Sequence, residues 1–226
     1  MSTDTMREYL AETYRIAYYQ QGDAYVSTSA LAEVMGVSAP AVTRMVQRLR
    51  DLGYLEHEPY RGVILTPNGE REALRTIRKH RIVERFLVDV MKFGWHEVHD
   101  YADDFGASVS DALAEKMNEM AGFPRRCPHG EPIPRPDGTM PRVVDAPLHD
   151  VATGHEYVVS RANTHDGDML RYLDSLGLRP GTTLHLIDRA PFNGPLRVRV
   201  GESEHFIGHE MSRVLRVCTR DEFELV

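Results

Sequence analysis

Two short helical patterns between residues 27 and 53 constrain the fold more than any other feature of the chain. The first follows a run of polar capping residues and ends at Gly36. The second begins at Ser38, has Pro40 in its first turn and repeats apolar side chains at helical spacing as far as Gly53. Two helices joined by about three residues predict a helix-turn-helix.

The residues after this pair predict a β-hairpin wing. Strand-like segments at 54–58 and 63–65 are separated by a turn that contains Pro59 and Gly62. A helix pair with such a wing is typical of winged-helix DNA-binding domains. The alternative is a three-helix bundle with a hairpin that binds no DNA.

The second helix of the pair is locally basic, because residues 38 to 50 include three arginines and no acid. These arginines lie opposite the apolar stripe, so we expect the start of this helix to meet base edges and phosphates in the major groove. Arg48 and Arg61 of the wing are expected to contact phosphate. The predicted DNA-binding residues are Ser38, Ala39, Pro40, Thr43, Arg44, Arg48 and Arg61.

Pairs of histidine and acid follow on two predicted helices. A long helix from Pro67 to about residue 91 carries His80 and Glu84 one turn apart within an otherwise apolar stripe. Burying these two side chains is costly unless they pair with each other or bind a cation, and their spacing suits chelation. For this pair alone a simple ion pair is the favoured explanation, but a second pair, His99 and Asp103, shifts the balance toward a metal site.

The inner sides of the two short middle helices are predicted from their apolar spacing. The helix over 95–105 is expected to bury its apolar stripe, and the helix over 110–120 is expected to use its methionines for packing. The stripes consist of Trp95, Val98, Ala102 and Phe105, and of Leu113, Met117 and Met120.

The C-terminal third changes character. Residues 124–147 hold seven of the thirteen prolines, which indicates a stiff, irregular linker. Short alternating apolar runs punctuated by glycine follow, as in a small β-barrel. We therefore predict a mainly α chain with a smaller β part. Its domains are a winged helix at 1–66, a helical domain at 67–123, the linker at 124–147 and a small β-barrel at 148–226.

Charge and composition exclude several classes of protein. The net charge of −7 argues against indiscriminate coating of DNA, and residues 67–226 hold 26 of the 34 acids. No apolar run is long enough for a membrane span, so we expect no membrane association. Two cysteines 91 positions apart form neither a disulfide framework nor a paired zinc motif. A reducing cytoplasm is the expected location.

Taken in order, these segments resemble the diphtheria toxin repressor and manganese transport regulator family of metal-dependent transcription regulators. The resemblance runs from the winged helix through LTPNGE at 65–70, RKHRIVERFLVDV at 78–90, EVHDYA at 97–102 and CPHGEPIP at 127–134 to DMLRYLDSLGLRPG at 168–181. It implies a helical dimerisation and metal-binding domain and a C-terminal FeoA-like, SH3-like barrel. It also implies a homodimer that Mn(II) or Fe(II) switches into its operator-binding form, most often as a repressor.

The resemblance also implies ligands for two metal sites. One would contain His80, Glu84 and His99, completed from the barrel by His165 and Asp168. The other would contain Glu8 and Asp103, but its two remaining positions hold Gly106 and Ala107 in place of Glu and His. That site is absent, rebuilt by neighbouring carboxylates or completed by water, and we expect the His80 cluster to be the better occupied.

The ligand types bear on the choice of metal and on the competing functions. Oxygen and imidazole donors without a cysteine at position 103 favour Mn(II) first and Fe(II) second. We expect palindromic operator DNA and a second copy of the chain as partners, and no small-molecule substrate. The alternatives are a metal-independent winged-helix regulator and a metal-dependent hydrolase. The hydrolase lacks support because the chain has neither an HExxH helix nor a phosphate-binding loop.

Overall fold

The structure is a computed structural model that describes residues 3–20, 24–106 and 108–226 of the 226-residue chain. The chain divides into two compact units, Met1–Lys79 with Pro134–Met140, and His80–Ile133 with Pro141–Val226. None of the helices in the described ranges has the length and apolar character that a membrane span requires. The predicted domain boundaries at 66, 123 and 147 stay predictions.

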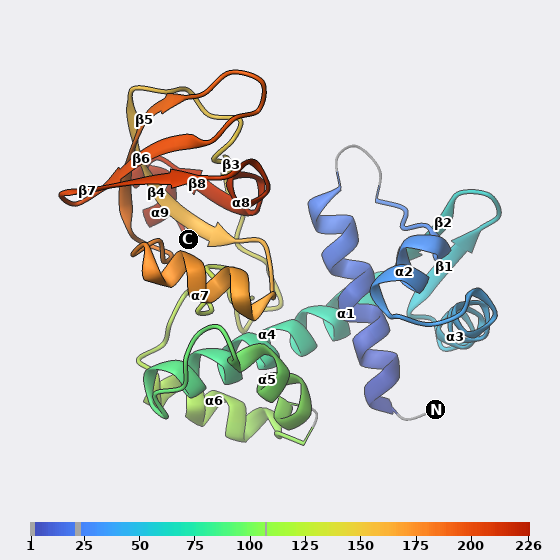
Figure 1. The fold of residues 1–226 in the computed structure, drawn as a ribbon. Coiled ribbons are helices and arrows are strands. Elements are labelled where there is room, and N and C mark those ends of the chain that lie inside the picture. Colours follow the sequence, from blue (N-terminus) through green and yellow to red (C-terminus); the bar gives the residue numbers. More distant parts are fainter. Residues whose placement is uncertain (1–2, 21–23, 107) are drawn as a thin grey trace. The chain divides into compact units, whose positions relative to one another are not determined.

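The first unit contains the predicted winged helix-turn-helix (Figure 1). Ser27 caps its second helix by accepting a hydrogen bond from the backbone N–H of Ala30, and Gly36 takes a positive φ of 60° directly after that helix ends. Leu31, Met45 and Leu49 are fully buried in the core between the helices and the hairpin. The elements are α1 (Thr3–Tyr19), α2 (Thr28–Val34), α3 (Ala39–Asp51), β1 (Leu55–Glu58), β2 (Gly62–Leu65) and the first half of α4 (Pro67–Asp89).

The second unit begins with the remainder of α4 and two shorter helices, α5 (Val98–Gly106) and α6 (Asp111–Met120). Helix α5 starts three residues later than predicted, because the Glu97 carboxylate accepts a hydrogen bond from the Gly94 N–H and shapes a turn before the helix. Trp95 is nevertheless buried in that turn.

The expectation that α5 and α6 bury their whole apolar stripes is wrong at three positions. Phe105, Leu113 and Met120 are about half exposed in the single chain, whereas Val98, Ala102 and Met117 are buried. Apolar spacing identifies the apolar face of a helix. It does not show whether that face packs against the same chain or against another one.

The barrel part is one antiparallel six-stranded sheet with the strand order β3-β8-β4-β5-β6-β7. Strand β4 buries five successive residues, 158 to 162, and is bulged between Val159 and Arg161, so it lacks the alternation by which strands are recognised in a sequence. The strands are β3 (Ala146–Pro147), β4 (His155–Ala162), β5 (Thr183–Arg189), β6 (Leu196–Val200), β7 (Ser203–Ile207) and β8 (Leu215–Cys218). The helices are α7 (Gly167–Ser175), α8 (His209–Val214) and α9 (Arg220–Glu224).

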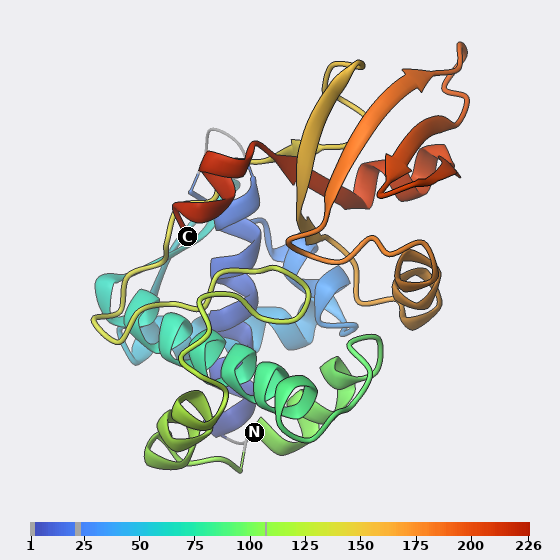
Figure 2. The same ribbon diagram turned by 90° about the vertical axis from the view of Figure 1, so that its left-hand side faces the viewer.

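The proline-rich segment that follows α6 runs as an irregular loop (Figure 2), and hydrogen bonds hold part of it in place. Part of it, residues 126–132, forms a closed loop in which Arg126 and Pro132 pair as an isolated β-bridge. Arg81 of α4 donates a hydrogen bond from Nη1 to the carbonyl oxygen of Pro132 at 2.6 Å, so this loop is fixed to the helix that carries His80 and Glu84.

Candidate metal centre

The carboxylate of Glu84 is the centre of a cluster of histidines. Its side chain is 2% exposed, on the buried side of α4. The Oε1 atom lies 3.2 Å from Nε2 of His80, 3.3 Å from Nδ1 of His99 and 3.4 Å from Nδ1 of His129. One carboxylate oxygen therefore faces three imidazoles that come from two helices and a loop.

The two His and acid pairs predicted from helical spacing come together. His99 and Asp103 lie one turn apart on α5, and Asp103 Oδ1 is 3.1 Å from His80 Nδ1. Asp103 Oδ2 is 3.6 Å from His99 Nε2, and this carboxylate is 60% exposed. The structure therefore groups Asp103 with His80 and His99, whereas the resemblance placed it in the other site.

Two candidate ligands escaped the sequence reasoning. Cys127 and His129 lie in the 126–132 loop, and their side chains are buried against Glu84. One donor atom each from Glu84, Cys127 and His129 lies within 4.8 Å of the others, and so does one each from His80, His99 and Asp103. The signal that could have found them is the spacing of Cys and His two residues apart in CPHG.

The remaining predicted ligands have different surroundings. The ring of His165 stacks on that of His99, with centroids 3.7 Å apart, so it borders the cluster. Asp168 is 92% exposed and pairs with Arg171, and Glu8 is exposed on α1 in the first unit. Among the described residues, neither acid belongs to the two donor groups. Gly106 ends α5, and Ala107 lies outside the described residues.

Electrostatics favour a charged Glu84. Burial would raise the pKa of its carboxyl, but His80, His129 and His99 together hold that pKa well below its usual range. Burial would lower the pKa of His129, but the neighbouring Cys127 and Glu84 raise it to about 11. Burial raises the pKa of the Cys127 thiol, and the charge of Glu84 adds to this effect.

The donor set fits a divalent cation. A buried carboxylate that is surrounded by imidazoles needs positive charge beside it, which in the metal-free protein comes from bound protons. A divalent ion can supply that charge while releasing the protons. Imidazole, carboxylate and thiol donors suit a borderline transition-metal ion.

The predicted DNA-facing residues lie at the start and along the length of α3 and in the turn of the wing. Ser38, Ala39, Pro40, Thr43, Arg44 and Arg48 are exposed, while Val42, Met45 and Val46 between them are buried. Ser38 has the backbone conformation of an N-cap, but its side chain makes no capping hydrogen bond. In the wing, the guanidinium of Arg61 lies 3.8 Å from the ring centroid of Tyr25 and pairs with Glu58. This is a stacked arrangement that holds the arginine in place.

Comparison with known proteins assigns all three parts of the chain. Residues 1–63 match the family model described as the iron dependent repressor N-terminal DNA binding domain. Residues 66–135 match the iron dependent repressor metal binding and dimerisation domain, and residues 146–217 match the FeoA domain.

Individual relatives agree with these matches. The diphtheria toxin repressor of Corynebacterium efficiens is 28% identical over 196 residues, covering 82% of this chain and 84% of the relative. The HTH-type transcriptional regulator MntR of Bacillus pumilus is 37% identical over 123 residues, covering 54% of this chain and 83% of the relative. A solved manganese-dependent transcriptional repressor in complex with manganese has a TM-score of 0.86 at 33% identity, covering 95% of this chain and 99% of that one.

These matches confirm the fold class and the resemblance found in the sequence, and they exclude the hydrolase alternative, because the matched families are repressors. The chain belongs to the diphtheria toxin repressor family of metal-dependent, DNA-binding transcriptional repressors.

Proposed function

We propose that this chain is a homodimeric repressor of manganese and iron homeostasis, in which a divalent cation held around Glu84 selects the operator-binding form. The observation that carries the proposal is the single buried carboxylate oxygen that lies within 3.4 Å of nitrogens of His80, His99 and His129. Those imidazoles belong to three segments that are separate in the sequence. A cation bound there would join the three segments.

The chain's own residues supply the switch. Without a cation, the charge of Glu84 is balanced by the imidazole of His129, whose pKa is raised, and by contacts with His80 and His99. A cation held by these residues would supply two positive charges and directional bonds. It would fix the positions of helix α4, helix α5 and the 126–132 loop relative to one another, and α4 continues directly from the β-hairpin wing. Linkage requires operator DNA to strengthen cation binding by the same factor by which the cation strengthens operator binding.

The choice of metal follows from the two donor groups. His80, His99 and Asp103 offer nitrogen and oxygen only, which supports Mn(II) as the first choice and Fe(II) as the second. The group with Cys127 adds a thiol, and thiolates favour softer ions such as Fe(II), Co(II) or Zn(II) over Mn(II). The preference for Mn(II) over softer ions therefore applies to the first group only. Glu8, His165 and Asp168 stay proposed as further ligands.

The homodimer is supported by exposed apolar side chains on the helical part of the chain. They lie within residues 66–135, which match the metal binding and dimerisation model. In a homodimer a second copy would cover such side chains, because the part of the chain that carries them matches a dimerisation domain. They are Tyr101, Phe105, Leu113, Met120 and Phe123, each between 45% and 65% exposed.

A twofold dimer presents two copies of α3, so it fits a palindromic operator with half-sites one or more DNA turns apart. We propose that Ser38, Ala39, Pro40, Thr43 and Arg44 meet the major groove and that Arg48 and Arg61 contact phosphate. Such a repressor would act in the cytoplasm, where both cysteines stay reduced.

A gel shift on a palindromic operator tests the proposal. Binding should require Mn(II) or Fe(II), and chelator should abolish it. The double substitution His80→Ala with Glu84→Ala should also abolish it, whereas Glu70→Gln, an exposed acid on the same helix, should not. Operator affinity that is unchanged by chelator and by the double substitution would establish the metal-independent alternative instead.

A further inference from the structure

The 126–132 loop, which carries Cys127 and His129, is docked against strand β4 of the barrel by its backbone. The N–H of Ala162 donates a hydrogen bond to the carbonyl oxygen of His129 at 2.9 Å. Gly130 has a φ of +93°, and a Cβ at this position would lie 2.2 Å from the carbonyl oxygen of Ser160. Only glycine allows the loop to approach the strand this closely.

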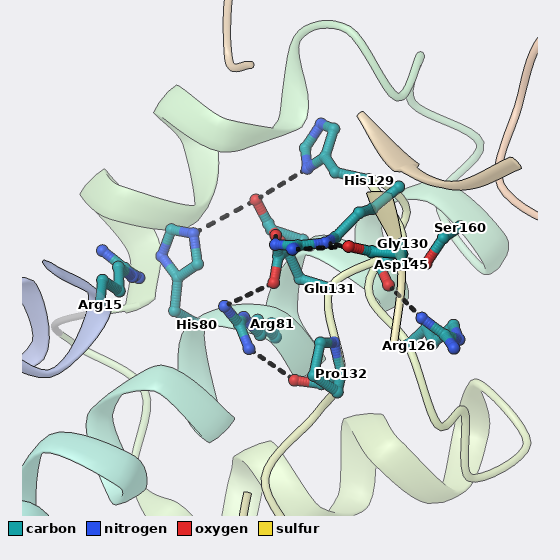
Figure 3. Close-up of polar contacts among 12 residues, drawn as sticks. Arg15, His80, Arg81, Arg126, His129, Gly130, Glu131, Pro132, Asp145 and Ser160 are labelled. Atoms are coloured by element: carbon teal, nitrogen blue, oxygen red, sulfur yellow. Dashed lines mark hydrogen bonds and ion pairs between the residues drawn. The ribbon is translucent and has the colours of Figure 1, made fainter. Parts of the chain in front are cut away.

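A buried chain of charged side chains fixes the same loop from both sides (Figure 3). Arg161 of β4 donates a hydrogen bond from Nη1 to Glu131 Oε1 at 2.8 Å. Nη2 of Arg81, on α4, lies 3.3 Å from Glu131 Oε2. The side chains of Arg161, Arg81 and Glu131 are 5%, 6% and 12% exposed. Glu131 therefore joins the helix that carries His80 and Glu84 to the barrel.

The chain of charges continues into the sheet. Arg161 also donates from Nε to Asp145 Oδ2 at 2.7 Å, and Asp145 accepts further hydrogen bonds from Ser160 and from Arg216 of β8. The guanidinium group of Arg161 thus binds Asp145 on one side and Glu131 on the other. These two partners fix the orientation of the Arg161 guanidinium toward Glu131. The backbone carbonyl of Glu131 also accepts a hydrogen bond from the Cys127 N–H at 2.8 Å.

We propose that Glu131 is a positioning residue of the metal centre: held between Arg81 and Arg161, it keeps Cys127 and His129 facing Glu84 and makes cation affinity depend on the barrel. The inference rests on the proposed function, because it assumes that the Glu84 cluster binds a cation. Glu131 itself contributes no ligand atom in this account. Its role is to set where the two loop ligands lie.

The test is a Co(II) titration of the full-length protein, since a Co(II)–thiolate bond gives a charge-transfer absorption that reports Cys127 directly. The wild type should show this absorption, and Cys127→Ser should lose it. Glu131→Gln should weaken Co(II) binding about tenfold or more, which is the usual effect of removing a residue that holds metal ligands in place. It should also reduce the thiolate absorption. Glu131→Asp, which keeps the charge, should recover part of the loss.

The matched control is Glu204→Gln, because Glu204 also pairs with two arginines, Arg197 and Arg199, but at the barrel surface. It should bind Co(II) as the wild type does. If circular dichroism shows that Glu131→Gln is unfolded, the same Co(II) titration of Arg161→Lys tests the role of Glu131 instead. The lysine keeps the charge but cannot pair with Asp145 and Glu131 as the guanidinium group does, so the same loss is expected.

Two negative results are distinguishable. Wild-type affinity and absorption in Glu131→Gln, or in Arg161→Lys where that variant decides, would overturn the role of Glu131 and leave the proposed function intact. A wild-type protein that binds neither Co(II) nor Mn(II) would overturn the proposed function itself.

Discussion

Replacing Glu84 by Gln removes the one charge that the whole cluster shares. The side chain keeps its shape, but its buried carboxylate no longer faces His80, His99 and His129 at 3.2 to 3.4 Å. Removing a residue that hydrogen-bonds to a metal ligand weakens metal binding by about 10- to 100-fold. Removing a ligand itself should weaken the binding by at least the larger of these factors. We expect Mn(II) affinity to fall at least about 100-fold, which is about 2.8 kcal/mol.

The same substitution should also destabilise the metal-free protein. Breaking a buried charge pair costs about 3 to 5 kcal/mol, and an amide that still accepts one hydrogen bond lies near the lower figure. Because the folded pKa of Glu84 is depressed, its carboxylate stabilises the fold at neutral pH, and this stabilisation is lost as the pH falls through that pKa.

Two assays separate these effects. Electron paramagnetic resonance of free Mn(II) gives the affinity, and urea unfolding with chelator present gives the stability. Glu70→Gln is the control, as an exposed acid on the same helix. Wild-type Mn(II) affinity in Glu84→Gln would refute the assignment of Glu84 as the centre of the site.

Other measurements test separate parts of the account. Mn(II) affinity should rise with pH, by up to about tenfold per pH unit, because the raised pKa of His129 means that cation binding displaces its proton. An Mn(II) affinity that stays constant from pH 6 to 8 would contradict this. Cys127→Ser should shift preference from Co(II) or Zn(II) toward Mn(II) in competition titrations, since the thiol is the only soft donor among the described groups. Arg44→Ala should cost about 1 to 3 kcal/mol in operator affinity by fluorescence anisotropy and leave Mn(II) binding by the free protein unchanged. Leu113→Asp should yield monomers by sedimentation, whereas the same change at exposed Phe206 of the barrel should not.

Helical periodicity accounts for what the sequence predicts well. Residues four apart on one helix must share a face, so spacing alone pairs His80 with Glu84 and His99 with Asp103. The apolar stripe of α3 likewise separates its buried face from its exposed basic face, as the structure confirms. These are local rules that tertiary packing did not override.

The loop ligands follow no such rule. Cys127 and His129 lie in a segment without a period, and their positions depend on contacts with a distant strand, such as the close approach of Gly130 to Ser160. Strand β4 is itself hard to recognise, because it buries successive residues and is bulged. Sequence spacing therefore identifies donors on helices, but not donors that a folded barrel brings to them.

Diffraction from a crystal grown with Mn(II), with anomalous data collected at the manganese absorption edge, tests the central claim most directly. We predict an anomalous peak within bonding distance of a carboxylate oxygen of Glu84 or of its partners His80 and His99. The same protein should require Mn(II) for operator binding. Mn(II) ordered only elsewhere, with Glu84 still paired to imidazoles alone, would contradict the claim that this cluster is the metal switch.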